Sequence, residues 1–359
     1  MEYLIGFLKA FFMFNIIMIF ASLLTWMERK QSALMQDRIG ANRASIFGFR
    51  FLGLIHIIAD AVKMITKEDF TPPQGYRFLH TMAPVIALFF ASISFAVIPF
   101  GGIYDLGGYT VSLQVLDLNV ALLFVFAMMS MGVYGFVLAG WASANNYALL
   151  GGVRASSQMI SYEITMGATV IGILMVYGTL SLQEMVIAQG QLLGGWIPMW
   201  GVLLQPLGFI LFATAAMAET KRVPFDIPEG ESEIIGYFVE YSGMKFGMFY
   251  LTDFIETVLG AALITVLFFG GWQVPYLYSD GFQFPWGATW QLSTVAVMLL
   301  QVTAFLVKLF FFCFILMLIR WTLPRFRWDQ LMKLGWTMML PLSIANIVVT
   351  GFLILLLQD

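Results

Sequence analysis

The segment YLIGFLKAFFMFNIIMIFASLLTWM, from Tyr3 to Met27, is almost entirely apolar, and its only charged residue is Lys9. A helix rises about 1.5 Å per residue, so a helix of this length crosses about 30 Å of hydrocarbon. Comparable apolar runs recur along the 359-residue chain, of which 60% is hydrophobic and 11% is charged. This composition excludes a water-soluble enzyme domain and indicates an all-α polytopic membrane protein.

The apolar runs predict eight transmembrane helices within a single integral membrane domain, residues 1–359. Their expected ranges are 3–27, 78–100, 116–139, 156–180, 196–218, 245–270, 289–320 and 334–357. Lys and Arg gather in alternate loops, most densely between the first two spans, whereas the loops around Tyr104, Glu184 and Tyr278 contain none. Cytoplasmic loops normally carry the excess of positive charge, so we expect both termini on the outer, periplasmic side.

The range 46–67 is apolar enough to suggest a further span, but its polar residues form one stripe. His56, Asp60, Lys63 and Lys67 follow i, i+4, i+7, i+11 spacing, which places them on one face of a helix. We therefore expect an interfacial amphipathic helix on the cytoplasmic side, lying in the membrane surface or against a partner protein.

The chain lacks the residues that most redox cofactors require. One cysteine, Cys313, cannot hold an iron-sulfur cluster alone, and two histidines, His56 and His80, make a buried bis-histidine haem improbable. The sequence also contains no G-x-G-x-x-G and no G-x-x-x-x-G-K-[ST] motif. We predict no metal site and no catalytic residue in this chain alone, so any electron donor must be on a partner.

Four ionisable residues lie well inside predicted spans, away from the span ends, where charge is expensive and therefore often functional: Glu163, Asp253, Glu256 and Lys308. Lys9 lies nearer the outer end of its span. One interpretation is that they are neutral or paired structural groups, with Lys308 balancing Glu256. For Glu163 and Asp253 a proton-handling role is favoured, because a desolvated carboxyl can gain or lose a proton near neutral pH.

The stretch from Glu219 to Tyr241 is acidic on the side of the membrane that normally favours positive charge. It contains two bases, Lys221 and Arg222, and six acids: Glu219, Asp226, Glu229, Glu231, Glu233 and Glu240. A solvated surface loop could tolerate this charge. The helix-breaking residues Pro224 and Pro228, interleaved with apolar side chains, instead predict a segment folded into the protein. Crowded acids titrate as a coupled group, so a charge formed nearby would move protons among them.

Five ordered motifs resemble one family. They are MERKQSALMQDRIGAN (27–42), ADAVKMITKE (59–68), GWASANNYALLGGVRASSQMISYE (140–163), AETKRVPFDIPEGESE with VEYSG (218–243) and PRFRWDQLM (324–332). Together they span nearly the whole chain and are similar to the quinone-site membrane subunit (the first, or H, subunit) of NADH:quinone oxidoreductase, respiratory complex I.

The resemblance implies a subunit that joins the hydrophilic electron-transfer arm to the membrane arm and binds quinone as substrate. It places NADH, FMN and iron-sulfur clusters only on partner subunits. The implied partners are the peripheral-arm quinone-site and iron-sulfur subunits, the small and antiporter-like membrane subunits and the lipid bilayer, with no nucleic acid. The implied location is an energy-conserving membrane, most simply the bacterial inner membrane.

The resemblance also implies site residues, carried over position by position. The resemblance implies a quinone chamber lined or supported by Glu28, Arg29, Arg38, Asp60, Arg222, Phe225 and Arg320. It implies a proton path through Glu163, Glu219, Asp226, Glu229, Glu231, Glu233 and Asp253.

The chain departs from the family pattern at a few positions. Asp253 stands where many members have Glu, and Phe254 replaces the Tyr that follows it. Ser130 lies where some members carry a buried Glu, so we expect a water or hydroxyl link in the acid chain there. Ala41 and Trp328 replace a Pro and a Tyr without an evident loss of function.

Two alternatives remain at this point. The membrane anchor of a membrane-bound hydrogenase resembles the same family but delivers electrons to protons. A stand-alone ion or solute transporter is disfavoured, because the sequence shows no repeated halves with broken helices.

Overall fold

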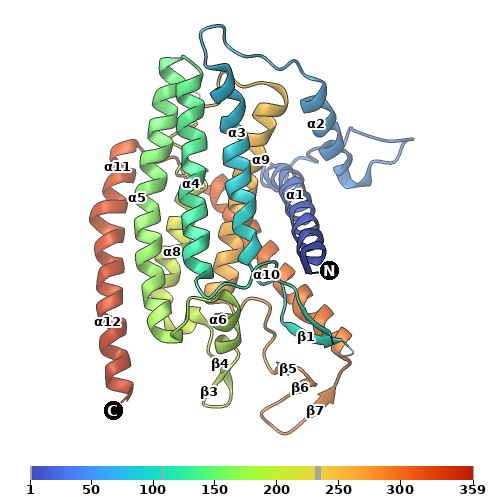
Figure 1. Ribbon diagram of the computed structural model, residues 1–359, viewed down its shortest axis with the longest axis vertical. Helices are drawn as coiled ribbons and strands as arrows, with labels where there is room; N and C mark the ends of the chain where they lie inside the picture. The colour runs from blue at the N-terminus through green and yellow to red at the C-terminus, as the bar shows by residue number, and fades with distance from the viewer. Residues whose placement is uncertain (1, 107–108, 231–235, 359) are drawn as a thin grey trace.

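The computed structural model describes residues 2–106, 109–230 and 236–358 and is dominated by long helices (Figure 1). Within these ranges, seven helical segments are long and apolar enough to cross a membrane. They comprise α1 (Glu2–Met35), α3 (Arg77–Ile93), α4 (Ala121–Ala142), α5 (Asn146–Tyr177), α9 (Gly243–Phe268), α10 (Thr294–Thr322) and the continuous run of α11 (Trp328–Lys333), the π-helix η3 (Leu334–Met339) and α12 (Leu340–Gln358). The class predicted from composition, an all-α polytopic membrane protein, is confirmed.

Shorter elements connect the long helices. The short helices are η1 (Phe51–Gly53), α2 (Ile55–Thr66), η2 (Ser94–Val97), α6 (Leu182–Gln189), α7 (Gly201–Leu204) and α8 (Pro206–Glu219). The strands form three small antiparallel sheets: β1 (Ile103–Leu106) with β2 (Tyr109–Ser112), β3 (Leu192–Leu193) with β4 (Ile197–Pro198), and β6 (Gly281–Gln283) between β5 (Leu277–Tyr278) and β7 (Thr289–Gln291). The strands lie at one end of the bundle and α2 at the other (Figure 1).

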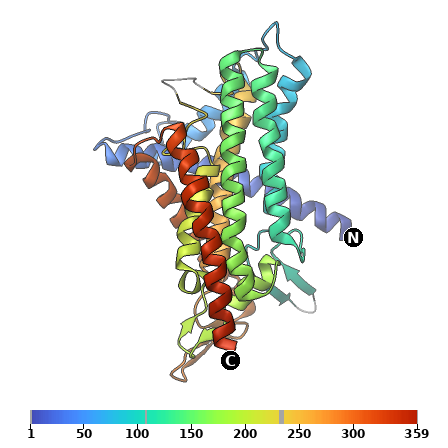
Figure 2. The same ribbon diagram turned by 90° about the vertical axis from the view of Figure 1, so that its left-hand side faces the viewer.

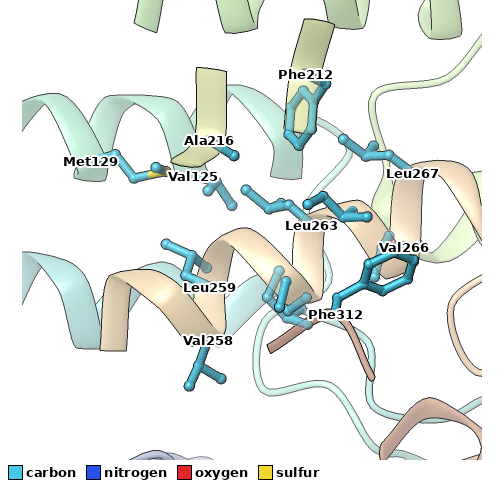
Figure 3. Packing of buried hydrophobic residues seen from close by; sticks show 14 of the residues in the cluster. Val125, Met129, Phe212, Ala216, Val258, Leu259, Leu263, Val266, Leu267 and Phe312 are labelled. Atoms are coloured by element: carbon cyan, nitrogen blue, oxygen red, sulfur yellow. The ribbon is translucent and has the colours of Figure 1, made fainter. Parts of the chain in front are cut away.

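Helix α9 is the centre of the bundle: in its 18-residue apolar stretch, 89% of the residues are buried inside the protein. It contacts α1, α3, α8 and α10, while α5 joins α4, α8 and α12 on one side (Figures 1 and 2). Figure 3 shows how α9 meets its neighbours: Leu263 and Leu267 lie close to Phe212 of α8, and Phe312 of α10 approaches from another side. These contacts fix the central helix from several directions, because close packing is the main attraction between helices in lipid.

Small residues allow the closest helix approach. A Cβ atom built on Gly135 of α4 would lie 2.7 Å from the Cβ of Ala87 and 2.8 Å from its backbone nitrogen on α3. A larger residue at this position would force the two helices apart. Small residues at such contacts are common between membrane helices.

The predicted fifth span, 196–218, is interrupted. Gln205 has φ −135° and ψ 58°, outside the helical region, and α8 begins immediately afterwards at Pro206. Proline suits the first helical position, where its missing N–H has no partner to lose. At about 1.5 Å per residue the helix Pro206–Glu219 covers only about 21 Å, so helix length alone does not establish the eighth crossing.

Several helices differ in extent from the predicted ranges. Helix α1 continues to Met35, so Glu28 and Arg29 lie on a helix and not in a loop. Helix α5 begins at Asn146 because the Asn145 side chain caps it by accepting a hydrogen bond from the Tyr147 N–H. The amphipathic helix expected over 46–67 occupies only Ile55–Thr66.

Candidate functional site

A carboxylate between two arginines marks the α2 end of the bundle. Glu28 on α1 accepts hydrogen bonds from the Nη1 atoms of Arg222, at 3.0 Å, and Arg320 on α10. The Glu28 side chain is only 13% exposed. The guanidinium of Arg222 also lies 4.0 Å from the centre of the Phe254 ring. Three residues that are far apart in the sequence and were each predicted for the quinone chamber are therefore brought together in one ionic group.

A second ion pair joins α1 to α2. Arg29 Nη2 lies 2.5 Å from Asp60 Oδ2, and Lys63 contacts the other oxygen of Asp60 at 3.1 Å. Arg38 is exposed and its Nε donates to Gln36 Oε1 at 2.6 Å. The predicted chamber residues other than Phe225 thus divide into a partly buried triad, a more exposed ion pair and a separate exposed arginine.

An open cavity of about 420 Å³ lies between α1 and α10. Its lining is mainly apolar but includes two cations, and comprises Trp26, Met27, Lys30, Gln31, Leu34, Arg38, Ile39 and Phe314. The buried Oε1 of Gln31 has no hydrogen-bond partner, while its Nε2 donates to the Phe314 carbonyl at 3.2 Å. A volume of a few hundred Å³ with few polar groups is typical of a small-molecule site.

A larger cavity of about 790 Å³ lies at the opposite end, beside the strands. Its wall includes Tyr104, Gln183 and Trp272 and contains none of the residues predicted for the site. We assign the candidate site to the α2 end, where the α1–α10 cavity lies, although this cavity is the smaller of the two. The partly buried charged groups gather at this end.

Phe225 does not line the α1–α10 cavity. Its side chain is 4% exposed, stacks on Phe326 with ring centres 5.4 Å apart and contacts Tyr162. Gln158 holds the same turn by donating from Nε2 to the carbonyls of Ala218, at 2.6 Å, and Phe225, at 2.7 Å. Phe225 therefore fixes the fold of the acidic segment.

The acidic segment is folded into the protein over its described residues, as predicted. Its most buried charge is Lys221, whose side chain is 0% exposed. Lys221 Nζ donates to Glu256 Oε2 at 2.6 Å and forms an ion pair with Asp253 Oδ1 at 3.4 Å, a contact that lacks hydrogen-bond geometry. The ammonium also lies 3.8 Å from the centre of the Phe136 ring. This lysine of the acidic cytoplasmic segment is the counter-ion of two acids on α9.

Lys308 has a different role from the one considered above. Its Nζ donates to the carbonyls of Phe269, at 2.8 Å, Gly271, at 3.0 Å, and Gln273, at 2.7 Å. All three ammonium hydrogens are thereby used where α9 ends. The interpretation in which Lys308 balances Glu256 was wrong.

Glu219 and Glu163 lie next to the ion-pair group of Lys221, Asp253 and Glu256. Glu219 is 2% exposed, its Oε2 has no hydrogen-bond partner, and it interacts electrostatically with Glu163, Glu256 and Lys221. A cavity of about 10 Å³, lined by Glu219 and Glu256 among apolar residues, is close to the size that holds one water molecule. The Ser130 hydroxyl donates a hydrogen bond to Glu163 Oε1. Position 130, where some family members carry a Glu, therefore places a hydroxyl against Glu163.

Asp226 and Glu229 continue the acidic series outside the long helices. Asp226 is 8% exposed, and its Oδ2 accepts a hydrogen bond from Arg325 Nη2 at 2.7 Å. Burial raises the pKa of Asp226 to about 6, although Arg325 and Arg320 oppose this shift. Burial and the charges of Asp253 and Asp226 also raise the pKa of Glu229. The predicted path residues Glu231 and Glu233 lie outside the described residues.

Asp226 is expected to titrate inside the physiological range. Because its pKa is raised by folding, the neutral carboxyl stabilises the fold at low pH, and this contribution is lost as pH rises through about 6. In an infrared titration, a protonated-carboxyl band should disappear with a midpoint near pH 6 in the wild type and be absent in Asp226→Asn.

Asp329→Asn is the control for that titration. Asp329 is exposed, and the hydrogen bond from Arg327 lowers its pKa, so its replacement should leave the band unchanged. A band near pH 6 that persists in Asp226→Asn would contradict the assignment.

Sequence reasoning missed the role of Lys221 and left Glu256 out of the site. The signals were present: Lys221 stands inside an acid-rich segment, and Glu256 follows Asp253 by one helical turn. Among the described residues, no group of three or more His, Cys, Asp or Glu side chains could hold a metal ion.

The fold and the site define a multi-pass membrane protein with a buried network of acids and bases beside an apolar cavity. A family model described as NADH dehydrogenase matches residues 8–351. Two similar relatives are H subunits of NADH-quinone oxidoreductase: one of Cytophaga hutchinsonii, 44% identical over 96% of this chain and 94% of the relative, and one of Flavobacterium johnsoniae, 44% identical over 95% and 93%. A third, the H subunit of the same enzyme in Bdellovibrio bacteriovorus, is 39% identical over 92% and 91%. The chain belongs to the family of NADH-quinone oxidoreductase H subunits, as the five motifs predicted.

Proposed function

We propose that this chain is the membrane subunit that admits quinone to its reduction site in NADH:quinone oxidoreductase and couples the reduction to proton translocation. The single observation that supports this most directly is the position of Glu28, which joins Arg222 to Arg320 and directly follows the cavity-lining residue Met27 on α1. The quinone, its reduction partners and the membrane orientation are part of the proposal.

The α1–α10 cavity suits an amphipathic ligand. Leu34, Ile39 and Phe314 supply an apolar wall for an isoprenoid tail, while Lys30 and Arg38 supply charge near its polar head. The cavity is open and lies between two membrane-spanning helices, so we propose that the ligand enters it laterally from the bilayer. Glu28, Arg29, Asp60, Arg222 and Arg320 would support the chamber beyond it, with Phe225 fixing the loop behind.

The acids form a series that could carry a charge signal inward. Reduction of a quinone adds two electrons and then takes up two protons, so protons drawn from neighbouring groups would change the local charge beside the triad. Asp226 and Glu229 interact electrostatically with Asp253, which pairs with Lys221, and Glu219 in turn senses Glu163 and Glu256. Acids that interact this closely respond to one another's protonation.

The remaining assignments follow from the same proposal. NADH, FMN and iron-sulfur clusters would be bound by partner subunits of the peripheral arm, and antiporter-like and small membrane subunits would receive the coupled charge. The membrane would be the bacterial inner membrane with both termini outside. The relatives are named for quinone oxidoreductase, which favours this function over a hydrogenase anchor or a separate transporter.

Leu34→Trp tests the route of quinone access. Leu34 lines the α1–α10 cavity and is 79% exposed in the chain, so a bulky ring there should obstruct the opening without disturbing the core. In membranes containing the whole complex, we expect the quinone KM to rise about tenfold, equivalent to about 1.4 kcal/mol, with unchanged NADH:ferricyanide activity.

Leu299→Trp is the matched control. Leu299 is an exposed leucine of α10 that does not line the cavity. Its replacement should leave quinone kinetics unchanged. Equal KM values in the wild type and Leu34→Trp would remove this cavity from the proposed route.

A further inference from the structure

Lys221 occupies an unusual position for a lysine. It follows the end of α8 with φ +54°, a conformation that places its backbone in the left-handed region, and its side chain is wholly enclosed. Its partners come from α9, Asp253 and Glu256, and the ring of Phe136 on α4 covers the ammonium. The amine is therefore the one described group in contact with both α9 acids.

The local geometry joins two parts of the acid series. Asp253 interacts electrostatically with Asp226 and Glu229 of the acidic segment that follows α8. Glu256 lies one helical turn further along α9 and shares the cavity of about 10 Å³ with Glu219. No hydrogen bond links Asp253 to Glu256 directly among the described contacts, whereas Lys221 reaches both.

We propose that Lys221 is a proton relay between Asp253 and Glu256, a deepening that rests on the proposed acidic path. In the first step the Lys221 ammonium gives a proton to the Glu256 carboxylate: one N–H bond breaks, one O–H bond forms, and both groups become neutral. In the second step a protonated Asp253 gives its proton to the neutral amine, which restores the ammonium and leaves a carboxylate. The net change is the transfer of one proton from Asp253 to Glu256.

A fixed counter-ion would make a different prediction from a relay. Arginine keeps a positive charge but does not lose its proton in proteins, whereas a lysine ammonium can transfer a proton to an acceptor, and Lys221 Nζ already donates to Glu256 Oε2. Lys221→Arg therefore retains the charge balance and removes the proton transfer. Lys221→Met removes both the positive charge and the proton transfer.

The experiment measures quinone reduction and proton translocation by the whole complex in membrane vesicles. For a relay, we expect Lys221→Arg to assemble and to reduce ferricyanide normally, while kcat for coupled quinone reduction falls at least about tenfold at unchanged quinone KM. Rescue of kcat by Lys221→Arg, relative to Lys221→Met, would show that the residue only balances charge and would overturn the relay.

A second variant covers the case in which arginine does not fit the enclosed site. The double replacement Lys221→Met with Glu256→Gln removes one positive and one negative charge and leaves an uncharged pair. The relay predicts the same loss of kcat in this variant, whereas wild-type turnover would overturn it. Glu219→Gln serves as the reference: if it abolishes coupling while the Lys221 variants do not, the acidic path stands and the relay alone fails.

Discussion

Replacing Glu219 by Gln is expected to lower coupled quinone reduction and proton translocation by about 100-fold, the scale at which a positioned acid or base usually contributes. Glu219 is almost fully buried, and one of its carboxyl oxygens has no hydrogen-bond partner. Glutamine keeps the shape of the side chain but cannot exchange a proton. The measurement is NADH-driven quinone reduction with a pH-sensitive dye in sealed vesicles, beside the NADH:ferricyanide rate of the same membranes.

Glu184→Gln provides the control for Glu219. Glu184 is an exposed acid at the strand-bearing end, where its Oε2 accepts a hydrogen bond from Thr179 at 2.5 Å. The same chemical change there should leave both activities intact. If Glu219→Gln instead prevented assembly of the complex, the acid would be a structural group, and full activity in a normally assembled variant would exclude it from the path.

The helices could be predicted because a membrane fixes both the length and the polarity of a segment that crosses it. Seven helical segments of the described residues are long and apolar enough to cross a membrane, because a helix satisfies its backbone internally and apolar side chains suit lipid. The ends of the helices were harder to predict, because the apolar run that marks a span ends at the first charged residue. Glu28 and Arg29 find partners on other helices and therefore remain on α1, which no local pattern reveals.

The acids of the site were predictable, but their partners were not. Burial of Glu219 and Asp226 followed from the prolines and apolar residues around them. Lys221 and Glu256 are 35 positions apart, so only the tertiary packing of α8 against α9 shows that they meet. Ser130 illustrates an intermediate case: the family pattern singled out the position, and the structure identifies Glu163 as its partner.

Replacing Glu28 by Gln is expected to raise the quinone KM about tenfold, or about 1.4 kcal/mol, because Glu28 orients both arginines of the triad. Its two oxygens each accept from a different guanidinium, and the Arg222 and Arg320 side chains are 10% and 30% exposed. An amide leaves two partly buried cations without a counter-charge, a loss that typically costs about 2–5 kcal/mol. The arginines should then move toward solvent or toward other acids, which changes the wall that the quinone headgroup meets.

A double-mutant cycle with Arg222→Ala separates this effect from general damage. If Glu28 acts by holding Arg222, the two replacements together should raise KM by less than the product of their separate effects, with a coupling energy of about 1–3 kcal/mol. Asp329→Asn, which breaks an exposed ion pair with Arg327, should have no effect because such surface pairs contribute little. Strict additivity, or an unchanged KM in Glu28→Gln, would show that the triad supports the fold without shaping the quinone site.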